Sequence, residues 1–297
     1  MKLQVLREGE KMQKLNFHDH RRTLHNNRYV YAVVSRRAKG LSIGINLNPD
    51  KSCNFACPYC QVDRRTPGGE RAVDIDILSN ELMRLFEWVK SGELWEIPPF
   101  NTADPSMRVV RDVSFAGDGE PTSCAQFVEA IECVGKLLQQ FGFQDVKFQL
   151  LSNATLFHKE RIQSALQRFW HFGGVIWAKL DAGTESWFQR VDGTRIPFDK
   201  VLRNIEWAAQ QKPLVIQAMF HKFDEEGPSE EEIEAWCGRI LSILNRQGEI
   251  SLVQIYSVAR TPAEESVKPL SREELVKIQD RLNAALHDDS SVLVSVY

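Results

Sequence analysis

The sequence predicts an α/β fold with a mainly parallel sheet, arranged as an open partial TIM barrel of (βα)6 topology. Apolar, β-branched runs alternate with stretches of helical periodicity, and several runs are nearly continuous in apolar character. Such runs are typical of strands buried on both faces of a parallel sheet. Strands that alternate with helices form right-handed β-α-β units. The 297 residues, 43% hydrophobic and 26% charged, are typical of a globular chain of one large or two small domains.

Six strands supply the predicted β-α units, and a short seventh run follows near the end. The predicted strands are 41–47, 109–116, 146–151, 175–180, 214–220, 250–258 and 292–296. The predicted helices are 76–91, 123–141, 158–170, 198–211, 230–247 and 272–287. Two of these helices begin with a capping-box pattern, Ser229 with Glu232 and Ser271 with Glu274. The Pro-rich stretch 92–106 is predicted to be a long loop.

The chain divides into a basic N-terminal extension (1–39), a core barrel (40–260) and a C-terminal helix with a short strand (261–297). Residues 1–40 hold ten Lys or Arg against three acidic residues, although the net charge of the whole chain is −3. A basic arm of this kind binds phosphates or is simply a solvated tail, and both interpretations stay open. The first ten residues lack the apolar stretch of a signal peptide, and no apolar run approaches a membrane span. We therefore expect a cytoplasmic protein with no membrane partner.

Three cysteines, Cys53, Cys57 and Cys60, follow the first strand with C-x3-C-x2-C spacing. Four thiolates saturate a four-iron cluster, so three leave one iron with an open position. A disulfide framework is disfavoured, because clustered cysteines in a chain without a secretion signal more often bind metal or act in catalysis. The three other cysteines are scattered and form no second pair of the kind that zinc sites use. Zinc and a chance cluster remain the minor alternatives.

Polar residues gather where the predicted strands end, which is where parallel α/β folds carry their chemistry. After the cysteine loop, these strand ends carry Gly117–Thr122 (GDGEPT), Ser152 with Asn153, Lys179 with Asp181, His221, and the segment from Tyr256 through Val258 to Arg260. Taken alone, GDGEPT is also what an ordinary strand-to-helix turn looks like. Together with the cysteine loop, the set predicts a ligand site at the carboxyl edge of the sheet.

These motifs resemble the radical S-adenosylmethionine (SAM) superfamily. The cysteine loop with Tyr59 before its last cysteine resembles the cluster loop of that superfamily, and Gly117–Pro121 resembles its GGEP motif, with Asp118 in place of a glycine. The segments SIGINLNPDKSCNFACPYC, SFAGDGEPT, AKLDAGTE and QIYSVARTPAEESVKPLSREEL further resemble the wyosine-related iron-sulfur oxidoreductase group. Residues 1–52 contain no cysteine, so the second cluster of the tRNA wyosine synthases is absent and wyosine synthesis is not predicted.

The resemblance implies a [4Fe-4S] cluster on Cys53, Cys57 and Cys60, with SAM on its open iron. It implies SAM contacts from the backbone of Tyr59, from the turn that contains Gly117, Gly119 and Glu120, and from Ser152, Asn153, Lys179, Tyr256 and Val258. Glu120 and Gly119 would bind the methionine amine. Lys179 would pair with the SAM carboxylate or with substrate, with Asp181 orienting it.

The implied activity is reductive cleavage of SAM to a 5′-deoxyadenosyl radical that abstracts hydrogen from an unidentified substrate, either a small molecule or tRNA. The implied partner is a low-potential electron donor such as flavodoxin or ferredoxin. Alternatives are a glycyl-radical-type protein activase, a tRNA-modifying radical SAM enzyme, and a non-catalytic iron-sulfur electron carrier. Full cysteine ligation of the cluster would favour the carrier.

Several further residues allow two interpretations. Cys124 is expected to be a small buried residue, with a role as hydrogen donor as the alternative, and Cys133 and Cys237 are expected in the core. His18, His20 and His25 are spaced too irregularly to predict a metal site. His221, at a strand end, is a candidate catalytic residue with Lys179 and Asp181. Arg260 either reaches a ligand or lies at the barrel rim.

Overall fold

The computed structural model describes residues 24, 27–35, 38–259, 262, 264–286 and 292–297. Its large sheet has eight strands in the order β1-β2-β3-β4-β5-β6-β8-β10, and β7 pairs with β9 in a small separate sheet. The strands of the large sheet are β1 (Val30–Ser35), β2 (Gly40–Ile45), β3 (Val110–Phe115), β4 (Lys147–Ser152), β5 (Val175–Lys179), β6 (Leu214–Met219), β8 (Ile250–Tyr256) and β10 (Leu293–Val296). The small sheet comprises β7 (His221–Phe223) and β9 (Val267–Pro269).

The described helices lie between these strands. They are α1 (Ile75–Ser91), α2 (Phe127–Gln140), α3 (Glu160–His171), α4 (Glu185–Asp192), α5 (Phe198–Gln211), α6 (Glu230–Asn245) and α7 (Arg272–Leu286). Short 3-10 helices are η1 (Glu93–Glu96), η2 (Phe100–Thr102), η3 (Pro105–Met107) and η4 (Pro121–Ser123). The first three occupy the stretch that the sequence predicts as a long loop.

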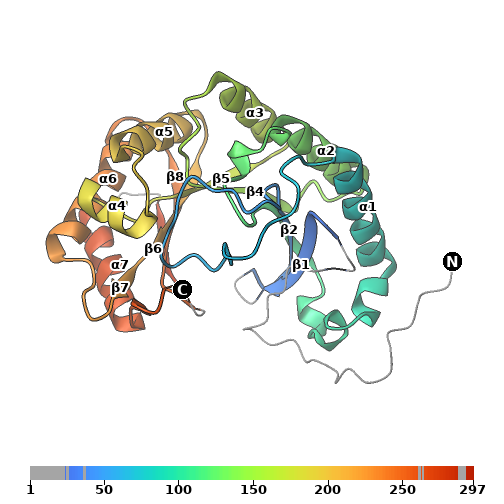
Figure 1. Cartoon of the computed structure of the whole chain (residues 1–297), viewed down its shortest axis with the longest axis horizontal. Coiled ribbons are helices and arrows are strands. Elements are labelled where there is room, and N and C mark those ends of the chain that lie inside the picture. The colour runs from blue at the N-terminus through green and yellow to red at the C-terminus, as the bar shows by residue number, and fades with distance from the viewer. Residues whose placement is uncertain (1–23, 25–26, 36–37, 260–261, 263, 287–291) are drawn as a thin grey trace.

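Every pairing in the large sheet is parallel except that of β1, which runs antiparallel to β2. In Figure 1 the helices form an arc around the outside of the strands. The prediction of an α/β fold with a mainly parallel sheet is confirmed, while its arrangement as a partial TIM barrel stays a prediction. The sequence analysis missed β1, β7, β9 and α4. Strand β1 falls in the segment predicted as an N-terminal extension, yet it is an edge strand of the sheet.

The face of the sheet under the helices is apolar and buried. Phe115, Phe148 and Ile176 on successive strands are at most 1% exposed. Phe115 and Phe148 have ring centroids 5.4 Å apart, and Phe169 of α3 lies 4.6 Å from Phe148. Because side chains alternate along a strand, this face accounts for one half of each apolar run.

The other face of the sheet is polar and lines a cavity of about 840 Å³. Ser114, Gln149 and Gln254 point into it from β3, β4 and β8, and all three are buried. The cavity is also lined by Tyr31 on β1 and by Tyr297 after β10. Since residues from both edges of the sheet line one cavity, the sheet curves around it. The inner face is only partly buried, since Trp177 and Gln217 on it stay partly exposed. Only the face under the helices is buried throughout by apolar packing, so the expectation of strands buried on both faces holds for that face alone.

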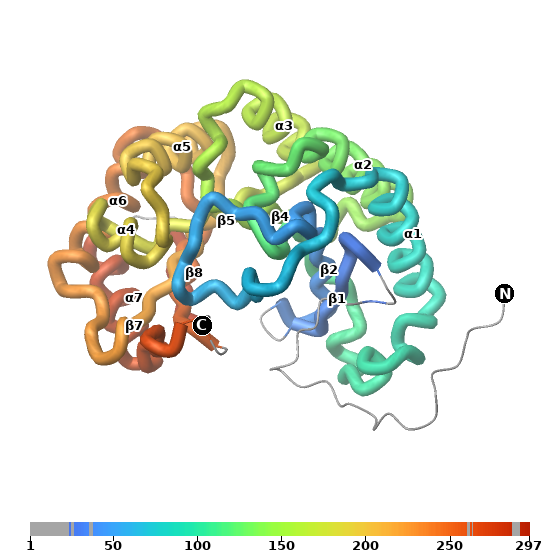
Figure 2. Tube along the Cα trace, in the orientation of Figure 1, coloured from blue at the N-terminus to red at the C-terminus, as the bar shows by residue number. Residues whose placement is uncertain are grey.

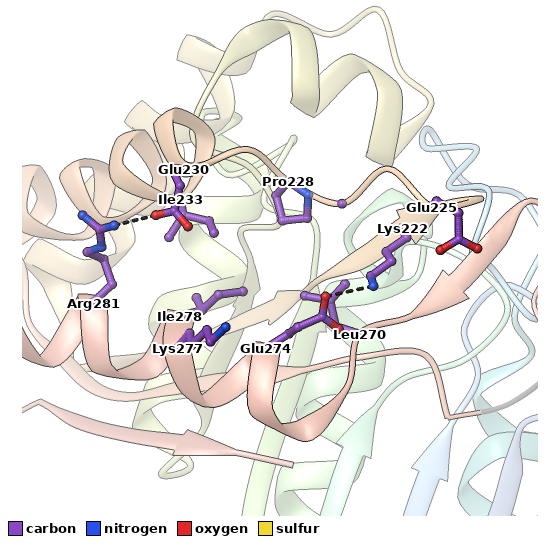
Figure 3. A pocket seen from close by; sticks show the side chains of 11 residues that line it. Lys222, Glu225, Pro228, Glu230, Ile233, Leu270, Glu274, Lys277, Ile278 and Arg281 are labelled. Atoms are coloured by element: carbon purple, nitrogen blue, oxygen red, sulfur yellow. Dashed lines mark hydrogen bonds and ion pairs between the residues drawn. The ribbon is translucent and has the colours of Figure 1, made fainter.

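Helices α6 and α7 close the C-terminal side of the molecule. Ser271 and Glu274 form a reciprocal capping box, with Ser271 N to Glu274 Oε2 at 2.8 Å and Glu274 N to Ser271 Oγ at 3.2 Å. The Ser229 hydroxyl accepts from Glu232 N at 3.2 Å, but the Glu232 carboxylate turns to the backbone of Gly183 instead. A cavity of about 450 Å³ lies between these helices and β7, flanked by two surface ion pairs (Figure 3). None of the predicted site residues lines it.

The segment between β2 and α1, which contains the three cysteines, arches across the strands in Figure 2. Its anchors define the site described below. Among the described helices, none combines the length and hydropathy needed to cross a membrane.

A buried carboxylate attaches the edge strand β1 to helix α1. Glu81 is 6% exposed and accepts hydrogen bonds from the backbone N–H groups of Arg28 (2.7 Å), Tyr29 (3.0 Å) and Val30 (3.0 Å). These donors are at the start of an edge strand, where strand-to-strand bonds do not use them.

We expect Glu81→Ala to lower the free energy of unfolding by about 3 kcal/mol, because it leaves buried N–H groups unpaired. Urea denaturation followed by circular dichroism measures this. Glu87→Ala, an exposed position on the same helix, is the control and is expected to stay near the wild type. Equal losses in both variants would contradict the assignment.

Candidate functional site

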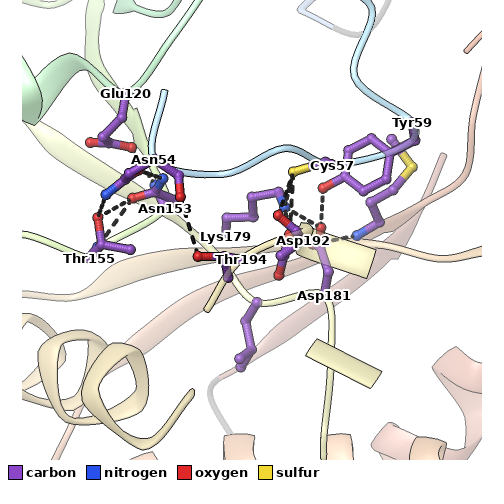
Figure 4. Close-up of polar contacts among 12 residues, drawn as sticks. Asn54, Cys57, Tyr59, Glu120, Asn153, Thr155, Lys179, Asp181, Asp192 and Thr194 are labelled. Atoms are coloured by element: carbon purple, nitrogen blue, oxygen red, sulfur yellow. Dashed lines mark hydrogen bonds and ion pairs between the residues drawn. The ribbon is translucent and has the colours of Figure 1, made fainter. Parts of the chain in front are cut away.

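Side-chain amides anchor the start of the cysteine loop to the end of β4 (Figure 4). Asn153 Nδ2 donates to Asn54 Oδ1 at 2.6 Å, and Asn54 Nδ2 donates to the hydroxyl of Thr155. The side-chain oxygen of Asn153, Oδ1, in turn accepts from Thr155 Oγ1 at 2.8 Å. Because Asn54 follows Cys53 directly, this network determines where the first cysteine lies. Asn153 was predicted as a ribose contact, whereas Asn54 and Thr155 were not predicted.

The GDGEPT turn lies directly against the cysteine loop. A Cβ on Gly119 would overlap the carbonyl oxygen of Ser52, and one on Gly117 would overlap the side chain of Asn46. Glycine is required at both positions because the two segments touch there. Asn46 completes the contact, since its Nδ2 donates to Asp118 Oδ2 at 2.7 Å and its Oδ1 accepts from Asp118 N at 3.1 Å.

Glu120 is a buried brace between two strand ends. Its carboxylate accepts from Ser152 Oγ (2.7 Å), Asn153 N (2.7 Å), Thr122 Oγ1 (2.6 Å) and Thr122 N (3.1 Å). Burial raises the pKa of this carboxyl, and these four donors oppose the rise. A carboxylate has about four acceptor sites. Glu120 therefore holds the turn to the end of β4, and its role toward a ligand amine stays a prediction.

Lys179 is the centre of a buried charge network (Figure 4). Its Nζ lies 2.7 Å from Asp181 Oδ2, forms an ion pair with Asp192, and lies 3.5 Å from Cys57 Sγ. Burial alone lowers the pKa of Lys179, but the carboxylates of Asp181 and Asp192 outweigh it and raise the pKa well above its ordinary value. The ammonium is also 4.9 Å from the ring of Tyr59. Lys179 is thus a permanent cation beside the second cysteine.

Asp192 is the functional residue that the sequence analysis missed most clearly. It ends the short helix α4, and its backbone carbonyl accepts from Ala56 N at 3.1 Å, so it also holds the cysteine loop. Burial raises the pKa of its carboxyl to about 6 despite the neighbouring Lys179. Thr184 as N-cap and Gly193 as a left-handed C-cap were the signals that could have predicted α4 and with it Asp192.

Tyr59 and His221 pack together next to this network. The Tyr59 hydroxyl donates to Asp181, and its ring meets the His221 ring edge-on with centroids 5.2 Å apart. His221 is 1% exposed, and neither ring nitrogen has a hydrogen-bond partner among the described residues. Burial lowers its pKa to about 4. Tyr256 ends β8, and Val258, two residues beyond the strand, packs beside Tyr59.

The three cysteines of the loop are the donor set available for an iron-sulfur cluster. All six cysteines are free thiols, which excludes the disulfide alternative for this structure. Among the residues described, no three Cys, His, Asp or Glu side chains converge as they would around one metal ion. In a four-iron cluster each thiolate binds a different iron, so the sulfurs need not converge. Burial raises the pKa of the Cys53 and Cys57 thiols, so a metal that binds there has to displace the thiol proton.

The other singled-out residues lie away from this network or outside the described residues. Cys124 and Cys237 are buried in the core, and Cys133 is half-buried on α2. The Cys124 sulfur is 3.9 Å from Gln126 Oε1. The predictions for His18, His20, His25 and Arg260 concern positions outside the described residues.

Comparison with known proteins places the fold. No protein-family model matches the chain. A UPF0026 protein of Helicobacter pylori is 27% identical over 179 residues, which cover 59% of this chain and 49% of that protein. GTPase Obg of Brachyspira hyodysenteriae is 26% identical over 255 residues, 85% of this chain and 33% of that protein. The chain thus spans half or less of these curated relatives.

Among solved structures, Streptococcus suis SuiB bound to S-adenosylmethionine matches with a TM-score of 0.59 and 14% identity, over 88% of this chain and 52% of that chain. At this identity the match shows a shared fold. The sequence contains no G-x-x-x-x-G-K-[ST] phosphate loop, so its own motifs do not point to GTP hydrolysis.

His221 makes stability depend on pH. Its pKa of about 4 in the folded chain lies below the value of 6.5 expected when unfolded, so only the unfolded state takes up this proton between those values. The contribution of His221 to the free energy of unfolding is therefore complete above pH 6.5. It falls by about 3 kcal/mol as the pH drops toward 4. We expect His221→Leu to flatten that part of the profile.

Urea unfolding at pH values between 4 and 7 measures this effect as the difference between wild type and variant. His171→Gln, an exposed position at the end of α3, serves as the control and should keep the wild-type slope. A His221→Leu profile parallel to that of the wild type would contradict the assignment of a neutral buried imidazole.

Proposed function

We propose that this chain is a radical SAM enzyme with one [4Fe-4S] cluster held by Cys53, Cys57 and Cys60. The observation that carries the proposal is the network of hydrogen bonds that holds this three-cysteine loop against the ends of β3, β4 and β5. Three cysteine ligands leave one iron open for a substrate, whereas an electron carrier uses four. The match to the fold of SuiB, which was solved with bound SAM, supports the proposal.

The chain's own residues orient and enclose the ligand. Bound at these cysteines, the cluster and SAM supply one-electron cleavage of the sulfonium to a 5′-deoxyadenosyl radical. The turn at Gly117–Thr122 and the loop at Ser52 lie in contact, which positions their backbone groups for the ligand. Tyr59 and Val258 form an apolar wall at the end of β8. A low-potential donor such as flavodoxin or ferredoxin would supply the electron.

The polar cavity provides room for the molecule from which hydrogen is taken. Trp177 lines it and is two residues before Lys179 on the same face of β5, so the cavity borders the strand that also carries Lys179. Gln217 Nε2 donates to Gln254 Oε1 at 3.0 Å across its wall. The lining combines amide and hydroxyl groups with charged and apolar side chains such as Asp112 and Leu151, which suits a substrate with both hydrogen-bonding and apolar parts. A small molecule and a flipped-out RNA base both meet that description.

The decisive experiment is anaerobic reconstitution with iron and sulfide, followed by reduction with dithionite in the presence of SAM. We expect about four irons per chain and formation of 5′-deoxyadenosine, measured by liquid chromatography. Cys57→Ala should lose both, because it removes one of three cluster ligands. Cys133→Ala, on α2, is the matched control and should retain both.

A cluster that neither changes its spectrum with SAM nor yields 5′-deoxyadenosine would contradict the enzyme and favour the electron carrier. Full iron content in Cys57→Ala would contradict the ligand assignment. A glycyl-radical activase would instead leave a radical on a partner polypeptide, which electron paramagnetic resonance detects.

A further inference from the structure

Two cations reach two of the three cysteine sulfurs. The Nζ of Lys179 lies 3.5 Å from Cys57 Sγ, and Nη2 of Arg64 lies 3.8 Å from Cys60 Sγ. The resemblance assigned Lys179 to the SAM carboxylate or to substrate, and it assigned nothing to Arg64. Both contacts are within the range of a hydrogen bond to sulfur.

Lys179 cannot move away from the sulfur of Cys57 without separating from two buried carboxylates. Asp181 and Asp192 both pair with its ammonium, and their side chains are 0% and 2% exposed. If Lys179 turned toward another anion, these buried carboxylates would lose their shared cation, which is strongly unfavourable. The two carboxylates therefore hold the lysine beside Cys57.

Arg64 is fixed in a different way, from the exposed side of the loop. Its guanidinium donates to the backbone carbonyls of Lys51 and Asp118, the latter at 3.3 Å. One side chain thus links the cysteine loop, the GDGEPT turn and the sulfur of Cys60. The next residue, Arg65, pairs instead with Asp63 at 3.2 Å and contacts neither segment.

We propose that Lys179 and Arg64 are positioning residues that raise the reduction potential of the cluster, and that Asp192 opposes them. The inference rests on the proposed function, since it needs a cluster at these cysteines. Reduction adds one negative charge to the cluster, which a neighbouring cation stabilises and a neighbouring anion destabilises. The Asp192 carboxylate lies 3.6 Å from Cys57 Sγ, so its charge acts on the same sulfur as Lys179 with the opposite sign.

The test is a redox titration of the reconstituted protein without SAM, followed by electron paramagnetic resonance. We expect a lower potential in Arg64→Gln, a higher one in Asp192→Asn, and no change in the control Arg65→Gln. Lys179→Met leaves two buried acids without a cation and can prevent folding. The double variant Lys179→Met with Asp192→Asn removes one charge of each sign and is expected to lie nearer the wild type than Asp192→Asn does.

Opposite shifts in Arg64→Gln and Asp192→Asn, at unchanged iron and sulfide content, support the inference. A structural role alone would change cluster content or stability without a sign that follows the charge. Intact clusters with the wild-type potential in both variants, or a shift of the wrong sign in either, overturn this inference and leave the proposed function standing. A wild-type chain that takes up no cluster overturns both.

Discussion

The ammonium of Lys179 lies between two buried carboxylates and the sulfur of Cys57. The arrangement of the site depends on this group of charges. One carboxylate follows β5 and the other ends α4, so a single side chain joins the strand end, the helix and the cysteine loop. Buried charges tolerate little displacement, because an unpaired charge in a low-dielectric interior is costly. Tyr59 adds a hydroxyl donor to Asp181, which ties the last part of the loop to the same network.

A second network, centred on Glu120, joins the ends of β3 and β4 to the cysteine loop, as Lys179 joins the end of β5 to it. Ser152 and Asn153 both donate to this carboxylate, and Asn153 passes the connection on to Asn54 in the loop. The two networks hold opposite sides of the cysteine segment. Their polar groups satisfy one another within the protein, so the loop is positioned before any ligand arrives. Preorganisation of this kind is what a cofactor with demanding geometry requires.

The two faces of the sheet have different roles, one in packing and one in lining a cavity. The outer face packs aromatic and branched side chains against the helices, which supplies the hydrophobic stabilisation. The inner face carries serine and glutamine residues around a cavity. Polar side chains around an open cavity add little hydrophobic stabilisation, which is consistent with a surface kept for binding.

The sequence by itself determined the α/β class, the six helices between parallel strands and the candidate cysteine ligands, because hydrophobic period and cysteine spacing are local signals. The sequence analysis did not predict strand β1, because that strand is held by Glu81 from a helix about fifty residues away. The same holds for Asp192 and Arg64, whose importance comes from the sulfurs they meet and not from any motif around them. Only the tertiary structure decided that Lys179 faces Cys57, because a cation is assigned to its partner by the charges that folding brings within a few ångströms.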